Sequence, residues 1–246
     1  MTMPTVLKFS LLYLALLLIS HLTSTTATDF PPCNPDDKAV LLKVRDHFGG
    51  PNGRLSDWEN DTDCCSEWSF VGCGMNSGRE YGRINTVTFS RSWGLSGTIP
   101  SDLGDLPFLS FFILADNINV TGTIPKSLGK LKNLYHLELD TNSLTGPIPN
   151  ELFKLKKLKV VDLSGNQLSG AIPPSVSSLS SLSEFNVNHN KLSGSIPPLP
   201  KSLKKVDLSY NQLCGPIPSG LKGFSPASFK NNKCLCGPPL VAQGCK

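Results

Sequence analysis

A regular pattern of apolar and polar positions runs through the middle of the chain. Leucines at 134, 137 and 139 alternate with other residues in Leu134–Asn142, and an asparagine closes the segment. Segments 158–166, 182–190 and 203–211 repeat the pattern. Alternation with a period of two predicts a short strand that is buried on one face. Such a strand cannot bury its apolar side alone, so the copies are expected to stack into a common core.

A six-residue tag that contains glycine and ends in Ile-Pro follows each expected strand. Its six copies span 95–100, 120–125, 144–149, 168–173, 192–197 and 213–218. Their glycines are spaced by 25 residues between Gly97 and Gly122 and by 21 between Gly194 and Gly215. A period of roughly 20–29 residues is typical of leucine-rich repeats. The sequence therefore predicts an α/β repeat fold, a leucine-rich-repeat solenoid with six repeats over 81–218 and short parallel strands on its concave face.

The asparagine and glycine positions of the repeat have separate expected roles. The asparagine side chain can satisfy buried backbone groups of the adjoining coil, which would form a ladder from repeat to repeat. Glycine in the tag permits a positive φ, and the proline fixes the turn after a buried isoleucine.

Cysteines occur only near the two ends of the chain. The eight are Cys33, Cys64, Cys65 and Cys73, then Cys214, Cys234, Cys236 and Cys245. An open solenoid needs capped ends, so we assign 28–80 and 219–246 to disulfide-bonded caps. Four cysteines in each cluster allow three pairings, which the sequence alone does not distinguish. Adjacent and Cys-x-Cys pairs do not match the usual zinc spacing, so we expect no metal site.

The first cap should begin with a helix. Residues 34–37, Asn-Pro-Asp-Asp, combine an N-cap, a first-turn proline and two acids. Gly49-Gly50-Pro51 would end the helix. One apolar face would carry Leu41, Val44 and Phe48. Trp58 and Trp68 are expected to cover the first repeat.

The first 27 residues have the pattern of a secretory signal peptide. Lys8 precedes an apolar run from Phe9 to Ile19, and a polar stretch leads to an expected cleavage point after Ala27. A retained membrane anchor is the alternative. No second apolar stretch of spanning length follows, so we expect no membrane span and no lipid anchor. The mature protein is expected to be a secreted monomer in the apoplast or cell wall.

Charge excludes one class of partner. The formal net charge is +4, and removing 1–27 takes away Lys8 and no acid, which leaves +3 (4 − 1). This balance is far from the basic surface of a nucleic-acid-binding protein, so we expect no nucleic-acid partner.

Four segments, Cys33–Lys38, Asp61–Cys65, Gly104–Pro107 and Asn232–Gly237, resemble plant polygalacturonase-inhibiting proteins. Members of that family usually carry more repeats than the six found here, so the chain resembles a shortened form. The resemblance implies inhibition of a fungal or insect polygalacturonase in plant defence, by covering the active-site cleft with the concave strands. It also implies the pairs Cys33–Cys64, Cys65–Cys73, Cys214–Cys234 and Cys236–Cys245.

The concave face offers an acidic patch with aromatic neighbours. Polygalacturonases bind an anionic chain and need basic residues around the cleft, which such a patch would attract. In the alternative interpretation, Val-Asp-Leu-Ser is simply a common sequence of the repeat. The expected partner-binding residues are Thr88, Phe111, Ile113, Tyr135, His136, Glu138, Asp140, Asp162, Glu184, Asn186, Asn188, Asp207 and Tyr210. Charge reversal at Glu138 and Asp162 together would then abolish binding.

Two surface features suggest further contacts. A lysine stripe that includes Lys132, Lys156 and Lys157 could contact pectin, an acidic polymer, or could simply be a solvated edge. Asn60 and Asn119 begin glycosylation sequons and are expected to be exposed and occupied.

Catalysis has little support in the sequence. His136 and His189 lie two repeats apart, roughly 10 Å across strands, which is too far for a base and its orienting group. Carboxylate pairs on an open surface lack a means of excluding water. We therefore expect that the protein is not an enzyme and that it binds no cofactor. The alternative function is a soluble recognition module for a peptide or a receptor-kinase ectodomain in signalling or development.

Overall fold

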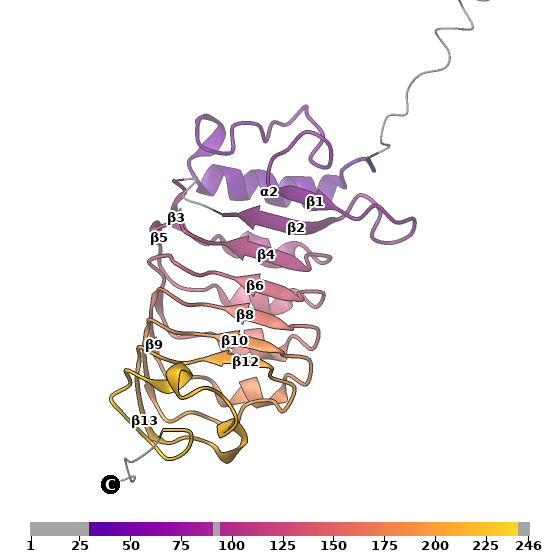
Figure 1. Cartoon of the computed structure of the whole chain (residues 1–246). Coiled ribbons are helices and arrows are strands. Elements are labelled where there is room, and N and C mark those ends of the chain that lie inside the picture. The colour runs from indigo at the N-terminus through magenta and orange to yellow at the C-terminus, as the bar shows by residue number, and fades with distance from the viewer. Residues whose placement is uncertain (1–29, 91–93, 241–246) are drawn as a thin grey trace, which may run out of the picture. The chain divides into compact units, whose positions relative to one another are not determined.

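The computed structural model describes residues 30–90 and 94–240 (Figure 1). Contacts divide the chain into Met1–Phe30 and Pro31–Lys246, and the fold described below belongs to the second unit. The expected signal peptide, 1–27, lies outside the described residues.

A stack of short strands, one from each repeat and one from the N-terminal cap, forms the main sheet. Figure 1 shows these strands one above the other in chain order. Every neighbouring pair is parallel except β1 and β2, which are antiparallel. The strands are β1 (Val71–Cys73), β2 (Ile84–Phe89), β4 (Phe111–Leu114), β6 (His136–Glu138), β8 (Val160–Asp162), β10 (Glu184–Asn186) and β12 (Lys205–Asp207). The predicted parallel repeat strands are therefore confirmed.

A second β surface, which the sequence did not predict, lies where the glycine tags run. Its strands pair in the order β14-β13-β11-β9-β7, with β3 and β5 paired separately. Their bounds are β3 (Ser96–Thr98), β5 (Asn119–Thr121), β7 (Thr145–Gly146), β9 (Gln167–Gly170), β11 (Lys191–Gly194), β13 (Gln212–Pro216) and β14 (Cys234–Cys236). The tag glycines all have positive φ, as predicted, from 74° at Gly146 to 115° at Gly97.

The helical segments of the repeats are 3-10 rather than α. Each of the five-residue segments η2–η5 follows a proline at its N-cap, and so short a run is typical of 3-10 turns. Their bounds are η2 (Ser101–Asp105), η3 (Lys126–Lys130), η4 (Asn150–Lys154) and η5 (Pro174–Ser178), and the shorter η1 (Gly50–Asn52), η6 (Ser219–Leu221) and η7 (Pro226–Phe229) lie in the caps.

One continuous core of leucine, isoleucine, valine and phenylalanine fills the space between these layers. The repeat asparagines form the predicted ladder beside it. Asn166 is representative: its Nδ2 donates to the carbonyls of Leu139 (2.8 Å) and Leu163 (3.2 Å), and its Oδ1 accepts from the Leu144 amide (3.0 Å). The ladder comprises Asn117, Asn142, Asn166, Asn190 and Asn211, and Asn232 continues it into the C-terminal cap.

The N-terminal cap contains the predicted helix, α2 (Pro35–His47). The Asn34 side chain accepts from the amides of the first turn, and the helix buries its apolar face, as predicted. Trp58 is fully buried and lies 5.9 Å from the ring of Phe89 in the first repeat. Trp68 stacks on Trp58 at 5.2 Å. The predicted cover of the first repeat is therefore present, with Trp58 in direct contact and Trp68 behind it.

A buried ion pair ties α2 to the first repeat strand. The Asp37 side chain is 1% exposed and accepts from Arg83 Nε (2.8 Å), Arg83 Nη2 (2.6 Å) and the Ile84 amide (2.9 Å). The bonds that Arg83 donates to the Asp37 carboxylate raise the pKa of Arg83. The Arg83 guanidinium also lies over the ring of Phe108, 4.7 Å from its centroid. The sequence placed Asp37 only at the helix N-terminus.

Three of the four expected disulfides are present within the described residues. They join Cys33 to Cys64, Cys65 to Cys73, and Cys214 to Cys234. Cys236 is also disulfide-bonded. Its expected partner, Cys245, lies outside the described residues.

Candidate functional site

The solvent-facing side of the main sheet, here called the strand face, presents its side chains in two rows. The strand registers align Thr88, Ile113, Glu138, Asp162, Asn186 and Asp207 in the upper row. They align Thr86, Phe111, His136, Val160, Glu184 and Lys205 in the lower row. Most of the expected partner-binding residues are thus brought together on one surface, while Asp140 and Asn188 follow the ends of β6 and β10.

Hydrogen bonds fix the carboxylates at the C-terminal end of the upper row. Asp162 Oδ1 accepts from the Ser164 amide (2.9 Å) and hydroxyl (2.5 Å), and Asp162 Oδ2 accepts from Asn186 Nδ2 (2.9 Å). Asp207 is held in the same way by Ser209. The Val-Asp-Leu-Ser sequence therefore has a structural role, since the carboxylate of its aspartate accepts a hydrogen bond from the amide of its serine, two residues later. The sequence pattern alone did not predict this role.

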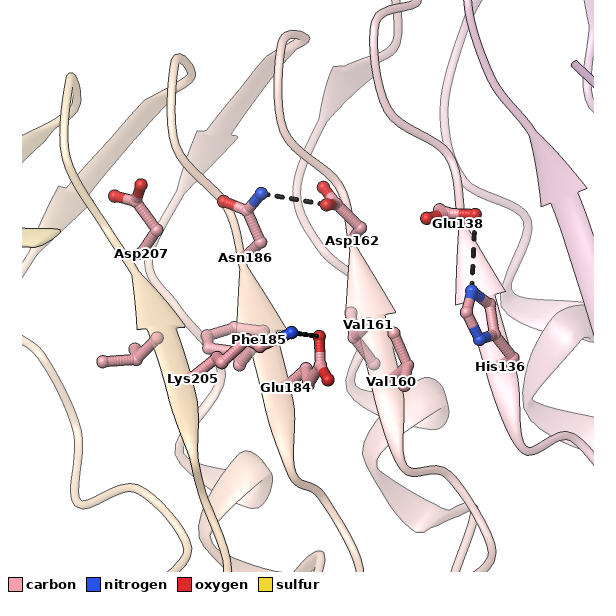
Figure 2. Close-up of a pocket in the computed structure, with 11 residues that line it drawn as sticks. His136, Glu138, Val160, Val161, Asp162, Glu184, Phe185, Asn186, Lys205 and Asp207 are labelled. Atoms are coloured by element: carbon pink, nitrogen blue, oxygen red, sulfur yellow. Dashed lines mark hydrogen bonds and ion pairs between the residues drawn. The ribbon is translucent and has the colours of Figure 1, made fainter.

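Glu138 and Glu184 are less constrained than the aspartates. Glu138 Oε2 lies 3.3 Å from His136 Nε2. This nitrogen is shielded from solvent, and the contact does not have the geometry of a hydrogen bond. Glu184 Oε2 lies 3.2 Å from Lys205 Nζ, and both side chains remain substantially exposed. Figure 2 shows both contacts: that of Glu138 with His136 joins the two rows along β6, and that of Lys205 with Glu184 lies within the lower row. Of the carboxylates on the strand face, these two are best placed to give up their present contacts and bind a partner protein instead.

Asp140 extends the acidic surface, and its surroundings disfavour the charged form of its carboxyl. Burial raises the pKa of its carboxyl, and the nearby charges of Asp162 and Glu138 raise it further, while a hydrogen bond from Thr141 opposes the shift. Such a raised pKa means that the ionised carboxylate costs folding free energy. The protonated Asp140 carboxyl does not carry this cost. Its contribution to stability is therefore fully present below the unfolded-state pKa and is lost as the pH rises through the folded-state pKa.

We therefore expect Asp140→Asn to raise the melting temperature at pH 7, with a gain that disappears below the ordinary aspartate pKa of about 3.9. Thermal unfolding of the variant and the parent at pH 7 and pH 3.5 measures this difference. Asp116→Asn, at an exposed position after the preceding strand, is the control. An equal or lower melting temperature for Asp140→Asn at pH 7 would contradict the expectation.

The expected aromatic residues divide between opposite edges of the strand face. Phe111 lies 5.8 Å from Tyr135 and 5.9 Å from His136 between ring centroids. Tyr210 instead stacks on His189 at 4.0 Å, beyond the other end of the strands. Tyr135 and Tyr210 therefore do not belong to one aromatic cluster.

A depression lies over Val160 in the middle of the strand face, and Figure 2 shows the side chains around it. Its volume is about 410 Å³. Val160, half-buried and apolar, sits between the longer side chains of His136 and Glu184 in the same row. Neither Val160 nor Lys205 is among the residues that the sequence predicts to bind a partner. No motif marks them, because their importance depends on the neighbouring strands.

The other predicted surface features are placed as follows. Lys157 Nζ donates to Asn133 Oδ1 (2.7 Å), and Lys156 Nζ donates to the Ser178 carbonyl (3.4 Å). Asn60 and Asn119 are both exposed, as predicted.

Within the described residues, the structure supplies neither a metal cluster outside the disulfides nor a membrane-crossing element. The group of neighbouring ligand-type side chains there consists of Cys33, Cys64 and Cys65, whose sulfurs are in disulfides. No helix in the described part of the chain has the length and hydropathy that a bilayer crossing requires.

Known proteins with this architecture are similar to the chain along most of its length. Models described as leucine rich repeat N-terminal domain and leucine rich repeat match residues 34–74, 132–192 and 202–224. The solved structure of Pollen Receptor Kinase 3 is 34% identical, has a TM-score of 0.70, and matches 84% of this chain and 99% of that one. The chain belongs to the leucine-rich-repeat proteins. The BIR2 ectodomain from Arabidopsis thaliana is also similar to this leucine-rich-repeat protein, with 28% identity and a TM-score of 0.63 over 86% of this chain and 100% of that one.

Curated relatives confirm the resemblance to polygalacturonase inhibitors. The polygalacturonase inhibitors of Pyrus communis and Vitis vinifera are each 40% identical to this leucine-rich-repeat protein. Each match covers 54% of this chain and 38% of the relative. The chain thus spans about two fifths of the length of these relatives.

Proposed function

We propose that this leucine-rich-repeat protein is a secreted, extracellular binding protein whose strand face covers the active-site cleft of a fungal or insect polygalacturonase. Inhibition by this route, in plant defence, requires no chemistry from the inhibitor. The relatives at 40% identity, which are named polygalacturonase inhibitors, support the proposal. The disulfides agree with an oxidising compartment.

The observation that carries the proposal is the concentration of carboxylates on one face of a chain whose formal net charge is +4. Glu138, Asp140, Asp162, Glu184 and Asp207 all lie on or directly beside the strand face. An enzyme that binds a polyanionic substrate needs a basic cleft. Opposite potentials speed the encounter of two such surfaces and fix their orientation.

The test is a dose–response of the purified, glycosylated protein against a panel of fungal endopolygalacturonases, assayed on polygalacturonate. The proposal predicts saturable inhibition of at least one enzyme. No inhibition across the panel, by protein whose fold is verified by circular dichroism, would overturn it.

Charge reversal should identify the face that binds. We expect Glu138→Lys/Glu184→Lys to weaken inhibition by about 30- to 100-fold, because two attractive contacts become repulsive. These glutamates are a better choice than Asp162, whose reversal would also break the bonds to Ser164 and Asn186. Inhibition curves for the variant and the parent at two salt concentrations provide the measurement.

The matched control is Glu59→Lys/Glu80→Lys, which makes the same change in net charge at two exposed positions of the N-terminal cap. It should leave inhibition within about twofold of the parent, since surface charges far from a contact are screened. Equal losses in both double variants would show that net charge, rather than the strand face, governs binding.

A recognition module is the second candidate, and one observation favours it. The chain matches 99% of the Pollen Receptor Kinase 3 structure but only 38% of the curated inhibitors. A soluble recognition module would bind a peptide or a receptor-kinase ectodomain in signalling or development. Recovery of a receptor ectodomain, and of no pectin-degrading enzyme, from cell-wall extract on the immobilised protein would favour this function.

A further inference from the structure

We propose that the depression over Val160 receives an arginine side chain of the bound protein. The inference rests on the proposed protein-binding role of the strand face, and it adds the chemistry of one contact at its centre. The depression, of about 410 Å³, is within the range of pockets that hold small ligands, roughly 300–1,000 Å³. Figure 2 shows that side chains from β6, β8, β10 and β12 surround it.

The floor of the depression suits a hydrocarbon chain. Val160 is the short apolar member of the lower row, between His136 and Glu184. The side chain of this half-buried valine would pack against the methylene stem of a long basic side chain, which buries its stem while its charged end stays among polar groups. A short acidic or hydroxyl side chain would leave this apolar surface uncovered.

The charge around the depression selects a cation. Glu138, Asp162 and Glu184 are negative, and the Lys205 ammonium already lies 3.2 Å from Glu184. Among the described lining residues, the remaining group that can be positive is His136, and only when it is protonated. A cation in the depression would therefore gain two carboxylates, Glu138 and Asp162; within the described residues neither forms an ion pair with Lys or Arg, and the basic neighbour of Glu138 is His136.

The hydrogen-bond capacity of these two carboxylates favours a guanidinium over an ammonium. Asp162 Oδ1 already accepts two bonds, both from Ser164, whereas Oδ2 accepts only that of Asn186 and retains one lone pair. Glu138 lies in register on the adjacent strand, about 4.8 Å away across the sheet. The flat, multi-donor guanidinium can donate to both groups at once, which a single ammonium does less well.

The direct test is titration of the ¹⁵N-labelled, disulfide-intact protein with Nα-acetyl-arginine methylamide, followed by two-dimensional NMR. We expect saturable shifts of the amides of Val160, Val161 and Asp162. The citrulline analogue, which is neutral and nearly isosteric, should bind about tenfold more weakly, because it lacks the charge-assisted bonds. Equal binding of the two probes, or no saturable shift at these amides, would overturn the inference.

Two variants locate the site. Glu138→Gln, nearly isosteric, and Val160→Phe, which fills the floor, should each weaken arginine-probe binding by about tenfold. Glu151→Gln, on the helical side of the repeat, is the charge control and should bind as the parent does. Should Val160→Phe fail to fold, Glu138→Gln alone decides the outcome.

The two proposals can fail separately. Saturable polygalacturonase inhibition that is unchanged in both Glu138→Gln and a folded Val160→Phe would overturn the arginine contact and leave the proposed function standing. Probe binding that is lost in Glu138→Gln, from a protein that inhibits no enzyme of the panel, would support the arginine contact and reject the polygalacturonase target.

Discussion

Replacing Asn166 with aspartate should lower the free energy of unfolding by roughly 3–5 kcal/mol at pH 7, because it leaves an uncompensated charge in a buried position. The asparagine Nδ2 donates to the carbonyls of Leu139, Leu163 and Ser164. A carboxylate of almost the same shape would instead turn an anionic oxygen towards three carbonyl oxygens. Urea unfolding of the disulfide-intact protein measures the difference.

The same substitution at Asn150 is the control, since Asn150 is exposed at the start of η4. Asn150→Asp should change the free energy of unfolding by no more than about 0.5 kcal/mol. The destabilisation at Asn166 should also shrink as the pH falls, because burial raises the pKa of the new carboxyl and the protonated acid regains one donor. Equal stability of the two variants at pH 7 would mean that the ladder does not hold the repeats together.

The ladder illustrates what could be predicted from the sequence. An asparagine three positions after the last strand leucine recurs at a fixed period, so its contacts in one repeat are repeated in the next. The same periodicity predicted the stacked parallel strands that carry the two rows of the strand face, because the registers of parallel strands follow the repeat. It did not predict the second β surface, since the glycine tags carry no alternation of apolar and polar residues.

The candidate site was only partly predictable for a related reason. Periodicity indicates which side chains point to solvent, and Glu138 and Asp162, which occupy the same position of successive repeats, do lie in register on adjacent strands. It does not indicate how those side chains pair across strands. The bonds from Ser164 and Asn186 to Asp162 depend on which residue each repeat carries at its own variable position. The depression over Val160 likewise arises from the contrast with His136 and Glu184 on the adjacent strands.

The cap contains a second large energetic contribution that a periodic pattern cannot reveal. We expect Asp37→Asn to lower the free energy of unfolding by roughly 3–5 kcal/mol. The amide can still accept a bond, but it cannot neutralise the guanidinium of Arg83, whose side chain is 20% exposed. The two residues are 46 positions apart in the chain, so their pairing follows only from the tertiary fold, which brings the first turn of α2 beside the start of β2.

Asp36→Asn supplies a closely matched control. Asp36 lies in the same first turn of α2, is exposed, and makes no ion pair within the described residues. It should lose no more than about 0.5 kcal/mol, the typical effect of a surface substitution. Urea unfolding with the disulfides intact compares the two variants.

A double-mutant cycle with Arg83→Met then isolates the pair. If the ion pair accounts for the loss, Asp37→Asn should cost much less in the Arg83→Met background than in the parent. An undiminished cost in that background would assign the loss to the bond with the Ile84 amide instead. Because β1 and β2 continue directly into the parallel strands, a loosened cap would also expose the apolar edge of the first repeat. Faster amide exchange across β2 and β4 than across β10 and β12 would be the sign of that local opening.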